Sequence, residues 1–515
     1  MSLPAGPAAV RSAPTWPYLV ALAIVAVISR LPQLLSRNLL LEGDECILGL
    51  MGMHLAQHRE FPIFFYGQKY GLSIVEAPAA ALSFTIFGPG ALPLKAAILA
   101  IWVAGVAFYF LAFARVLGRA RSFWITLLLV LMPAWAATSM KAWSGYVTAF
   151  SATGATLYVM TRNDAAAVRW LIAGAMTAII YFAQPLWLPS LLPFVLYFLW
   201  LNRTRLSCMG SYVSGILCLI LLIATTRNHW TAGAAETWTG PPIGDRHPLL
   251  AVPRLLNQTY LNLTGSYYFG AVVHAGRFTT AAARVWLGIL GAAALLQGYR
   301  LLTRKYLVWS HLLFASVSST VIANLILLEW RDPRYLLALN VPLVYVAGVE
   351  FFALIDAYRV PVRRWATAIV ILLALQGVSM REFADYNYMW WTNSRESPSE
   401  TKTLRKVIGY MRSRGVSHAF AMNALLQWPI TFYSRETVIT RWKADVDRYP
   451  PYIRKVDRAI ARGETVAIVG YVGYTYGLER MVTNPDAIIN IDGKYFVYIG
   501  ADENLLRKAG FAFPG

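Results

Sequence analysis

Two adjacent carboxylates, Asp44 and Glu45, stand just after a membrane-length apolar run and at the start of an apolar-periodic stretch. A carboxylate on the outside of a membrane can take a proton from a substrate hydroxyl, which is general base catalysis. The same pair also suits a helix start, with Asp44 as the cap and Glu45 in the first turn. Both interpretations can hold together, because a capping side chain is rigidly placed. Glu76, further along the same segment, is another candidate acid.

Cations are expected on the same side of the membrane. The stretches "FFYGQKYG", "TSMKAWSGY" and "EWRDPRYLL" contribute Lys69, Lys141, Arg331 and Arg334. Each of them could be an interfacial anchor at headgroup depth. Together, near a carboxylate, they suit a lipid phosphate. Phosphate is already a competent leaving group, so it needs electrostatic stabilisation more than a general acid.

The composition is that of a polytopic membrane protein. Of 515 residues, 57% are hydrophobic and 14% are charged, whereas soluble domains carry about 25% charged residues. The net charge of +20 does not indicate nucleic acid, because most of the excess lies in short loops between apolar runs, where Lys and Arg set orientation. The three cysteines have no zinc or redox spacing, and we expect neither a disulfide framework nor a cleavable signal.

Apolar runs near 20 residues predict eleven transmembrane helices. They begin near Trp16, Leu92, Phe123, Gly145, Trp170, Leu186, Gly210, Ala283, Leu307, Leu336 and Trp365. Residues 74–87 form a shorter apolar segment, which we interpret as a juxtamembrane or re-entrant helix. With eleven spans, five arginine-rich loops fall on one side, which the positive-inside rule makes cytoplasmic.

This topology divides the chain into a membrane domain over residues 1–380 and an external tail over 381–515. The membrane domain has two large external loops, 37–91 and 227–282. In the first loop, Ile47, Leu48, Met51 and Leu55 stand at helical spacing, which predicts a helix on the membrane surface. The tail alternates helical stretches with apolar strands, which predicts a small extracytoplasmic α/β domain. The predicted fold is therefore a polytopic α-helical membrane protein with about 11 transmembrane helices, juxtamembrane helices and this C-terminal domain.

On these residues the chain resembles the GT-C superfamily of integral membrane glycosyltransferases, in the branch of protein O-mannosyltransferases and lipid A aminoarabinose transferases. The matching stretches are Gly43-Asp44-Glu45, "FPIFFYGQKYGLSIVEAPAAALSFTIFG" and "RDPRYLLALNVPL". The resemblance implies a polyprenyl-phosphate-linked sugar donor, an inverting transfer and Asp44 as the base. It also implies phosphate binding by Lys69 and by the late Arg-Tyr element with Arg331, Arg334 and Tyr335.

One departure concerns the second acid. The second external loop of those relatives often carries an acid, whereas "ATSMKAWSGYVTAF" offers Lys141 and no carboxylate. This leaves Glu45 or Glu76 as the second acid, or none. It also weakens a metal-dependent interpretation, because hard cations require several oxygen ligands. His54 and His58 are interpreted as the surface of an interfacial helix, and we expect no metal and no cofactor.

Aromatic side chains in or beside the external loops suit sugar rings, and they equally suit an aromatic belt. The candidates for lining a sugar or lipid site are Tyr66, Tyr70, Trp143, Tyr146, Tyr267 and Tyr268.

The predicted reaction is inverting transfer of a sugar from a polyprenyl phosphate to an acceptor hydroxyl. A single displacement inverts the anomeric carbon. The expected partners are this donor, an acceptor glycan, lipid or protein, and membrane lipids, without nucleic acid. The expected location is a bacterial inner membrane, with the site and tail on the periplasmic side.

Two alternatives remain open. A ligase or polymerase acting on lipid-diphosphate-linked glycans fits the 227–282 loop, which contains Arg246, Arg254 and Arg277. A lipid or glycan transporter fits the number of spans, but transporters usually place ionisable groups at mid-membrane. Here the notable charges cluster at the external ends.

Overall fold

The computed structural model describes residues 14–36, 39, 41–68, 70–162, 166–230, 248–266, 276–305, 307–327, 332–383, 400–444 and 447–513. Eleven of its helices coincide with the predicted spans, and each predicted start lies within a helix or within two residues of one. These helices are α1 (Trp16–Leu34), α4 (Ala91–Leu117), α5 (Arg119–Leu131), α6 (Tyr146–Met160), α7 (Ala167–Ala183), α8 (Leu188–Leu201), α9 (Leu206–Trp230), α11 (Arg277–Leu302), α12 (Val308–Leu327), α13 (Leu337–Tyr358) and α14 (Val362–Arg381).

Seven helices in the described part of the chain are long and apolar enough to cross a membrane by themselves, namely α1, α4, α9, α11, α12, α13 (extended by Pro333–Leu336) and α14. An eighth crossing is formed if α5 is counted with the short turns η1 (Pro133–Trp135) and η2 (Thr138–Met140), which bend from it by 61°. Helices α6, α7 and α8 have 15, 17 and 14 residues. The prediction of a polytopic helical membrane protein is confirmed.

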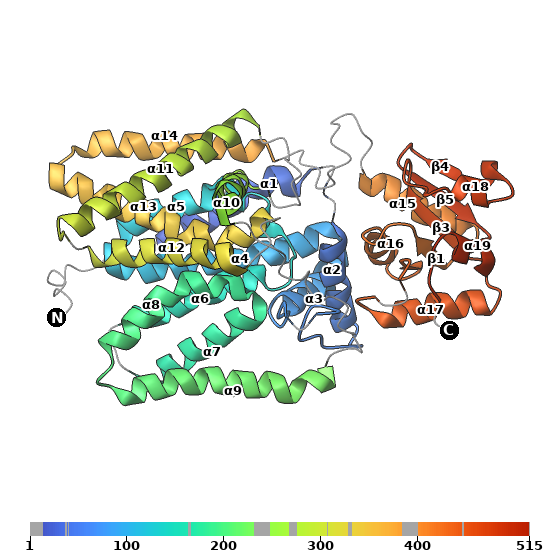
Figure 1. Cartoon of the computed structure of the whole chain (residues 1–515), viewed down its shortest axis with the longest axis horizontal. Coiled ribbons are helices and arrows are strands. Elements are labelled where there is room, and N and C mark those ends of the chain that lie inside the picture. Colours follow the sequence, from blue (N-terminus) through green and yellow to red (C-terminus); the bar gives the residue numbers. More distant parts are fainter. Residues whose placement is uncertain are drawn as a thin grey trace.

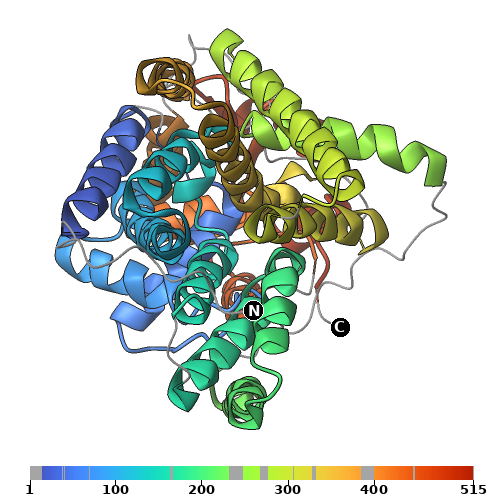
Figure 2. The same ribbon diagram turned by 90° about the vertical axis from the view of Figure 1, so that its left-hand side faces the viewer.

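The two ends of the helical bundle differ (Figure 1). The connections from α8 to α9, from α11 to α12 and from α13 to α14, which carry predicted cytoplasmic arginines, lie at one end. The C-terminal domain lies beyond the other end, and helices α2 (Gly43–Ala56) and α3 (Glu76–Phe87) stand between it and the bundle. Figure 2 looks from the arginine-rich end and shows the helices packed side by side. The predicted first external loop therefore contributes a helical layer between two domains.

Helix α2 is buried on all sides, which corrects the prediction of a helix on the membrane surface. Ile47, Leu48 and Met51 are fully buried. A Cβ on Gly49 would lie 2.6 Å from the ring of Phe432, which belongs to the C-terminal domain. The sequence showed an apolar helix, but what covers its outer face lies almost 400 residues further along the chain.

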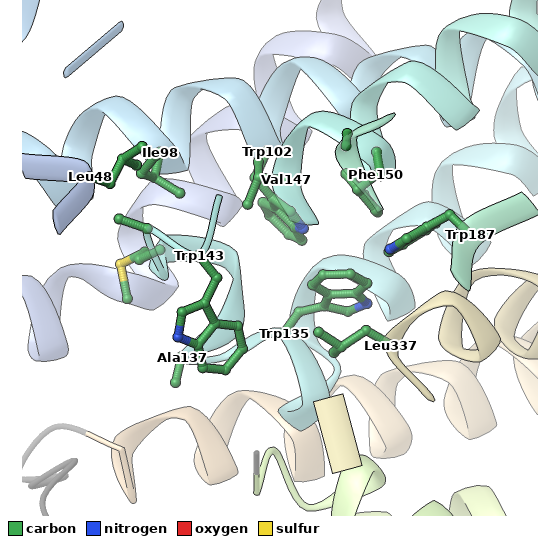
Figure 3. Packing of buried hydrophobic residues seen from close by; sticks show 14 of the residues in the cluster. Leu48, Ile98, Trp102, Trp135, Ala137, Trp143, Val147, Phe150, Trp187 and Leu337 are labelled. Carbon is green, nitrogen blue, oxygen red and sulfur yellow. The ribbon is translucent and has the colours of Figure 1, made fainter. Parts of the chain in front are cut away.

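Aromatic packing fixes the connection between α5 and α6, where the helix path is broken. Trp135 lies 4.9 Å from Phe150, which in turn lies 5.7 Å from Trp102 and 5.8 Å from Trp187, as ring centroids (Figure 3). The buried guanidinium of Arg30 donates 3.1 Å to the Trp135 carbonyl and lies 4.6 Å from the Trp102 ring. This connection leads into the stretch with Lys141 and Trp143, so the same packing fixes where those side chains lie.

The C-terminal domain is a five-stranded sheet with helices, as the sequence predicted. The strand order is β2-β1-β3-β5-β4, with β1 parallel to β2 and β3, and with β5 antiparallel to β3 and β4. Its elements are α15 (Glu400–Ser413), β1 (His418–Ala421), α16 (Gln427–Tyr433), β2 (Ile439–Arg441), α17 (Pro450–Ala461), β3 (Ala467–Tyr471), α18 (Leu478–Met481), η5 (Pro485–Ala487), β4 (Ile489–Ile491), β5 (Tyr495–Ile499) and α19 (Glu503–Lys508). The helical stretches of the tail, "TLRKVIGYMRSRG" and "RKVDRAIARG", correspond to α15 and α17. The apolar stretches "TVAIVGYV" and "KYFVYIG" correspond to β3 and β5.

A polar cluster joins α2 to this domain around His54. The fully buried imidazole lies 2.7 Å from the Tyr66 hydroxyl, 3.2 Å from the Tyr452 hydroxyl and 3.3 Å from a Glu436 carboxylate oxygen. Arg59 pairs with the other Glu436 oxygen. The interpretation of His54 as part of an exposed interfacial surface was therefore wrong. The second histidine of that pattern, His58, is exposed but lies beyond the end of α2.

This junction predicts acid sensitivity. Burial opposes ionisation of Glu436, but hydrogen bonds from His54, Arg59 and Tyr452 outweigh it and lower the pKa of this carboxyl from 4.5 to about 2. Because the folded-state pKa is depressed, the ionised carboxylate stabilises the fold above pH 4.5, and this stabilisation is lost as the pH falls towards 2. We expect the thermal unfolding temperature of wild type to fall over that window and that of Glu436→Gln to start lower and to fall less. Equal pH slopes for the two proteins would contradict the assignment.

Candidate active site

Asp44 lies in the first turn of α2 but does not cap it. The capping residue is Glu42, which exchanges hydrogen bonds with Glu45 in a capping box. The Asp44 side chain is 30% exposed, and its Oδ1 lies 3.3 Å from Nη1 of Arg448. The capping box of Glu42 and Glu45 therefore fixes the helix turn that carries Asp44, and the Asp44 carboxylate is partly exposed to solvent.

Arg448 comes from the C-terminal domain, in the connection between β2 and α17. Its guanidinium lies 5.2 Å from the Phe65 ring. Gly67 has φ +74°, and a Cβ there would lie 2.7 Å from the Arg448 Cα, so a larger residue at position 67 would displace the arginine. The sequence analysis missed Arg448 because nothing in the local sequence separates it from the other basic residues of a basic tail.

Arg334 lies in the short helix η4 (Pro333–Leu336), which leads into α13. Its Nε lies 2.8 Å from Oδ2 of Asp332, and the Asp332 carboxylate also accepts the Arg334 backbone N–H at 3.2 Å. The guanidinium stands 5.2 Å from the Trp143 ring and 5.5 Å from the Tyr335 ring. Two aromatic faces and one acid thus orient a half-buried arginine at the N-terminal end of α13.

The Tyr70 hydroxyl interacts electrostatically with Arg448, Arg334 and Asp44. Burial raises the pKa of its hydroxyl, while the positive charges of Arg448 and Arg334 act in the opposite direction and Asp44 acts with burial. The side chain is 39% exposed. Asp44 and Arg448 are therefore in contact, and the charges of both and of Arg334 act on the Tyr70 hydroxyl, with Tyr335 beside Arg334.

Glu45 and Lys141 face each other inside the protein rather than the open site. The Glu45 carboxylate accepts from Lys95 Nζ at 2.6 Å and lies 3.3 Å from Lys141 Nζ, and all three side chains are fully buried. Lys141 also lies 3.1 Å from a Glu42 oxygen. The structure places neither residue where the sequence analysis expected an acid or a phosphate ligand, and Lys95 was not predicted.

Glu76 caps helix α6. Its Oε1 accepts from the backbone N–H groups of Gly145 and Thr148, each at 3.1 Å, and from the Thr148 hydroxyl at 3.0 Å. Burial raises the pKa of this carboxyl to about 7, although these hydrogen bonds oppose the rise. The geometry is that of a helix N-terminal acceptor in the protein interior.

The predicted aromatic lining separates into groups. Trp143 is buried, and its indole N–H donates to Glu42, while Tyr146 packs on it with ring centroids 5.6 Å apart. Tyr66 is buried in the His54 cluster. Four predicted site residues lie outside the described residues, namely Lys69, Arg331, Tyr267 and Tyr268. Among the residues that are described, no group of three or more His, Cys, Asp and Glu side chains could hold a metal ion.

The fold of this chain, a membrane bundle joined to a small α/β domain, is shared with solved structures of two membrane transferases, which confirms the predicted resemblance at the level of fold. ArnT from Cupriavidus metallidurans in the apo state matches with a TM-score of 0.63 and 12% identity over 97% of this chain and 99% of that chain. The same protein bound to undecaprenyl phosphate matches with a TM-score of 0.60 and 12% identity, covering 98% of this chain and 100% of that one.

The Archaeoglobus fulgidus oligosaccharyltransferase tethered with an acceptor peptide matches with a TM-score of 0.50 and 14% identity over 96% of this chain and 72% of that chain. No protein-family model matches the sequence, and no curated protein matches it either. At these identities the likeness concerns the fold.

The hydrogen bonds of Glu76 predict that Glu76→Ala and Glu76→Gln differ in thermal stability. Glu76→Ala removes the acceptor for three donors at the start of α6, and unsatisfied buried donors cost about 1–3 kcal/mol each. Glu76→Gln keeps one carbonyl oxygen as the acceptor. We expect a lowered thermal unfolding temperature for Glu76→Ala and a near-native one for Glu76→Gln. A stable Glu76→Gln protein without activity would instead assign this residue to the chemistry.

Proposed function

We propose that this protein is an inverting glycosyltransferase that moves a sugar from a polyprenyl-phosphate donor to an acceptor hydroxyl on the extracytoplasmic face of a membrane. The observation that carries the proposal is the contact of one partly exposed carboxylate, Asp44, with Arg448, and the electrostatic interaction of the same carboxylate with Arg334. Support also comes from the shared fold with a protein that binds undecaprenyl phosphate.

In this proposal Asp44 is the general base. It takes the proton from the acceptor hydroxyl as the oxygen attacks the anomeric carbon, and the bond from that carbon to the phosphate oxygen breaks on the opposite face. The departing lipid phosphate keeps the bonding electron pair and gains negative charge. The partial exposure of Asp44 suits this role, because the acceptor must arrive from the aqueous side.

The arginines would bind the phosphate and its developing charge. Guanidinium groups present paired N–H donors that match phosphate oxygens. Arg334 comes from the membrane domain and Arg448 from the C-terminal domain, so a donor phosphate between them would bridge both. Lys69 and Arg331 remain predicted phosphate ligands. Tyr70, Tyr146, Tyr335 and Trp143 are proposed to line the donor, and Tyr267 and Tyr268 remain predictions of the same kind.

Two further predicted acids have positioning roles in this proposal. Glu45 would hold the start of α2, and Glu76 the start of α6. The arginine-rich loops at the opposite end of the bundle favour placing the site outside the cytoplasm, and we propose a bacterial inner membrane with the site on its periplasmic side. Which sugar is carried, and whether the acceptor is a glycan, lipid or protein, depends on pocket details beyond these residues.

The direct test of the base is Asp44→Asn in purified protein with labelled polyprenyl-phosphate sugars. Loss of a general base typically costs about 10²–10⁴-fold in rate, and we expect that loss in transfer with donor binding retained. Asp492→Asn is the matched control, since Asp492 pairs with Lys406 within the C-terminal domain. Undiminished transfer by Asp44→Asn would refute the assigned role. Donor movement across vesicles without sugar transfer by wild type would favour a transporter, and use of only lipid-diphosphate glycans would favour a ligase or polymerase.

A second test concerns the arginine of the C-terminal domain. A hydrogen bond to a charged group is worth about 1.5–3 kcal/mol, so Arg448→Gln should weaken binding of the polyprenyl phosphate by about 10- to 100-fold. Arg414→Gln is the control, because Arg414 packs on Tyr410 elsewhere in the same domain. If the two variants bound polyprenyl phosphate with equal affinity, Arg448 would not be a ligand of the donor phosphate.

A further inference from the structure

Four charged side chains form a buried network at the start of α2, and they are Glu42, Glu45, Lys95 and Lys141. Glu45 binds Lys95 at 2.6 Å and Lys141 at 3.3 Å, and Lys141 also lies 3.1 Å from Glu42. The side chains of Glu45, Lys95 and Lys141 are 0% exposed, and that of Glu42 is 10% exposed. Their formal charges sum to zero. Charges buried so deeply persist only when they are paired in this way.

Lys141 has a special place in the network, because its ammonium lies between two carboxylates. Glu42 and Glu45 each have a carboxylate oxygen near it, and they stand three residues apart at one helix start. Carboxylate oxygens converging on a cation are also what a hard divalent ion requires. Here the cation is covalently attached to the chain, and the backbone N–H of the next residue, Ala142, donates to Glu45 at 3.3 Å.

This network reaches both halves of the active site. Asp44 lies between Glu42 and Glu45 in the sequence, so the capping box that they form fixes the turn that carries it. On the other side, the Trp143 ring lies 5.4 Å from the Lys141 ammonium and 5.2 Å from the Arg334 guanidinium. A shift of the Lys141 ammonium would therefore disturb the base and a phosphate-binding arginine together.

We propose that Lys141 is a positioning residue that acts as a built-in cation in the place of a divalent metal ion, so that the site works without one. The predicted effect of Lys141 on activity rests on the transferase function proposed above. The network itself does not depend on that function. Asp44 and Arg334 contact the substrates in the proposal, whereas Lys141 acts through Glu42, Glu45 and Trp143.

Replacement of Lys141 by alanine should open the site to a divalent cation. Lys141→Ala removes the ammonium and leaves two buried carboxylates with one remaining lysine, Lys95, and with room for an ion and its water. A divalent cation such as Mn²⁺ would then satisfy the free oxygens. Lys141→Met removes the same charge but fills most of the space with an apolar side chain, so it serves as the matched control.

The experiment measures Mn²⁺ binding and transfer separately. Binding is measured by electron paramagnetic resonance on the purified full-length proteins, without donor or acceptor. We expect one bound Mn²⁺ per chain for Lys141→Ala and none for wild type or Lys141→Met. In EDTA we expect transfer by wild type to be unchanged and transfer by both variants to fall by about 100-fold, which is typical of a misplaced catalytic geometry. Added Mn²⁺ should restore Lys141→Ala and not Lys141→Met.

Three results would overturn the proposal. One is loss of wild-type transfer in EDTA, which would show that a metal ion is needed despite Lys141. Another is wild-type transfer by Lys141→Ala in EDTA. The third is a Lys141→Ala protein that binds polyprenyl phosphate normally, and is therefore folded, but takes up no Mn²⁺. The EDTA test on wild type stands even if a variant fails to fold, and the Mn²⁺ measurement stands even if the chain transfers no sugar.

Discussion

The burial of charge at the start of α2 is the interaction on which the region between the helical bundle and the C-terminal domain depends. Glu45, Lys95 and Lys141 are inaccessible to water, so each requires the others at hydrogen-bonding distance. They come from α2, from α4 and from the connection before α6, and their pairing fixes these three segments relative to one another. Because Asp44 is adjacent to Glu45 in the sequence, the same pairing also fixes the position of this partly exposed residue.

The C-terminal domain completes the same region from the outside. Helix α16 covers α2 through the close approach of Phe432 to Gly49, and Glu436 pairs with His54 and Arg59 at the far end of α2. Since Arg448 lies on this domain and faces Asp44, docking of the domain and assembly of the site are one event. A domain that could be taken for a separate module is thus part of the proposed active centre.

The comparison with ArnT indicates that this arrangement tolerates almost complete replacement of the sequence, since identity is 12% over nearly the full length of both chains. What persists is the overall fold, with a TM-score of 0.63. Packing of apolar helices and strands depends mainly on pattern and volume, whereas a site depends on individual side chains. The chemistry of this chain therefore has to be argued from its own residues.

The sequence by itself determined the elements. Helical periodicity, run length and the placement of arginines predicted a polytopic helical bundle, the short helix α3 and the α/β tail, because these properties depend on residues close together in the chain. It also identified Asp44 and Arg334 as candidates, through their positions at external helix ends.

Only the tertiary structure decided the roles of the individual charges. Glu45 and Asp44 are adjacent and chemically alike, yet one is buried against two lysines and the other is partly open beside Arg448. Lys95 lies in an apolar helix and Arg448 in a basic tail, so nothing local distinguished them. Partners separated by 50 to several hundred residues set burial and pairing, and these long-range contacts exist only after the chain has folded.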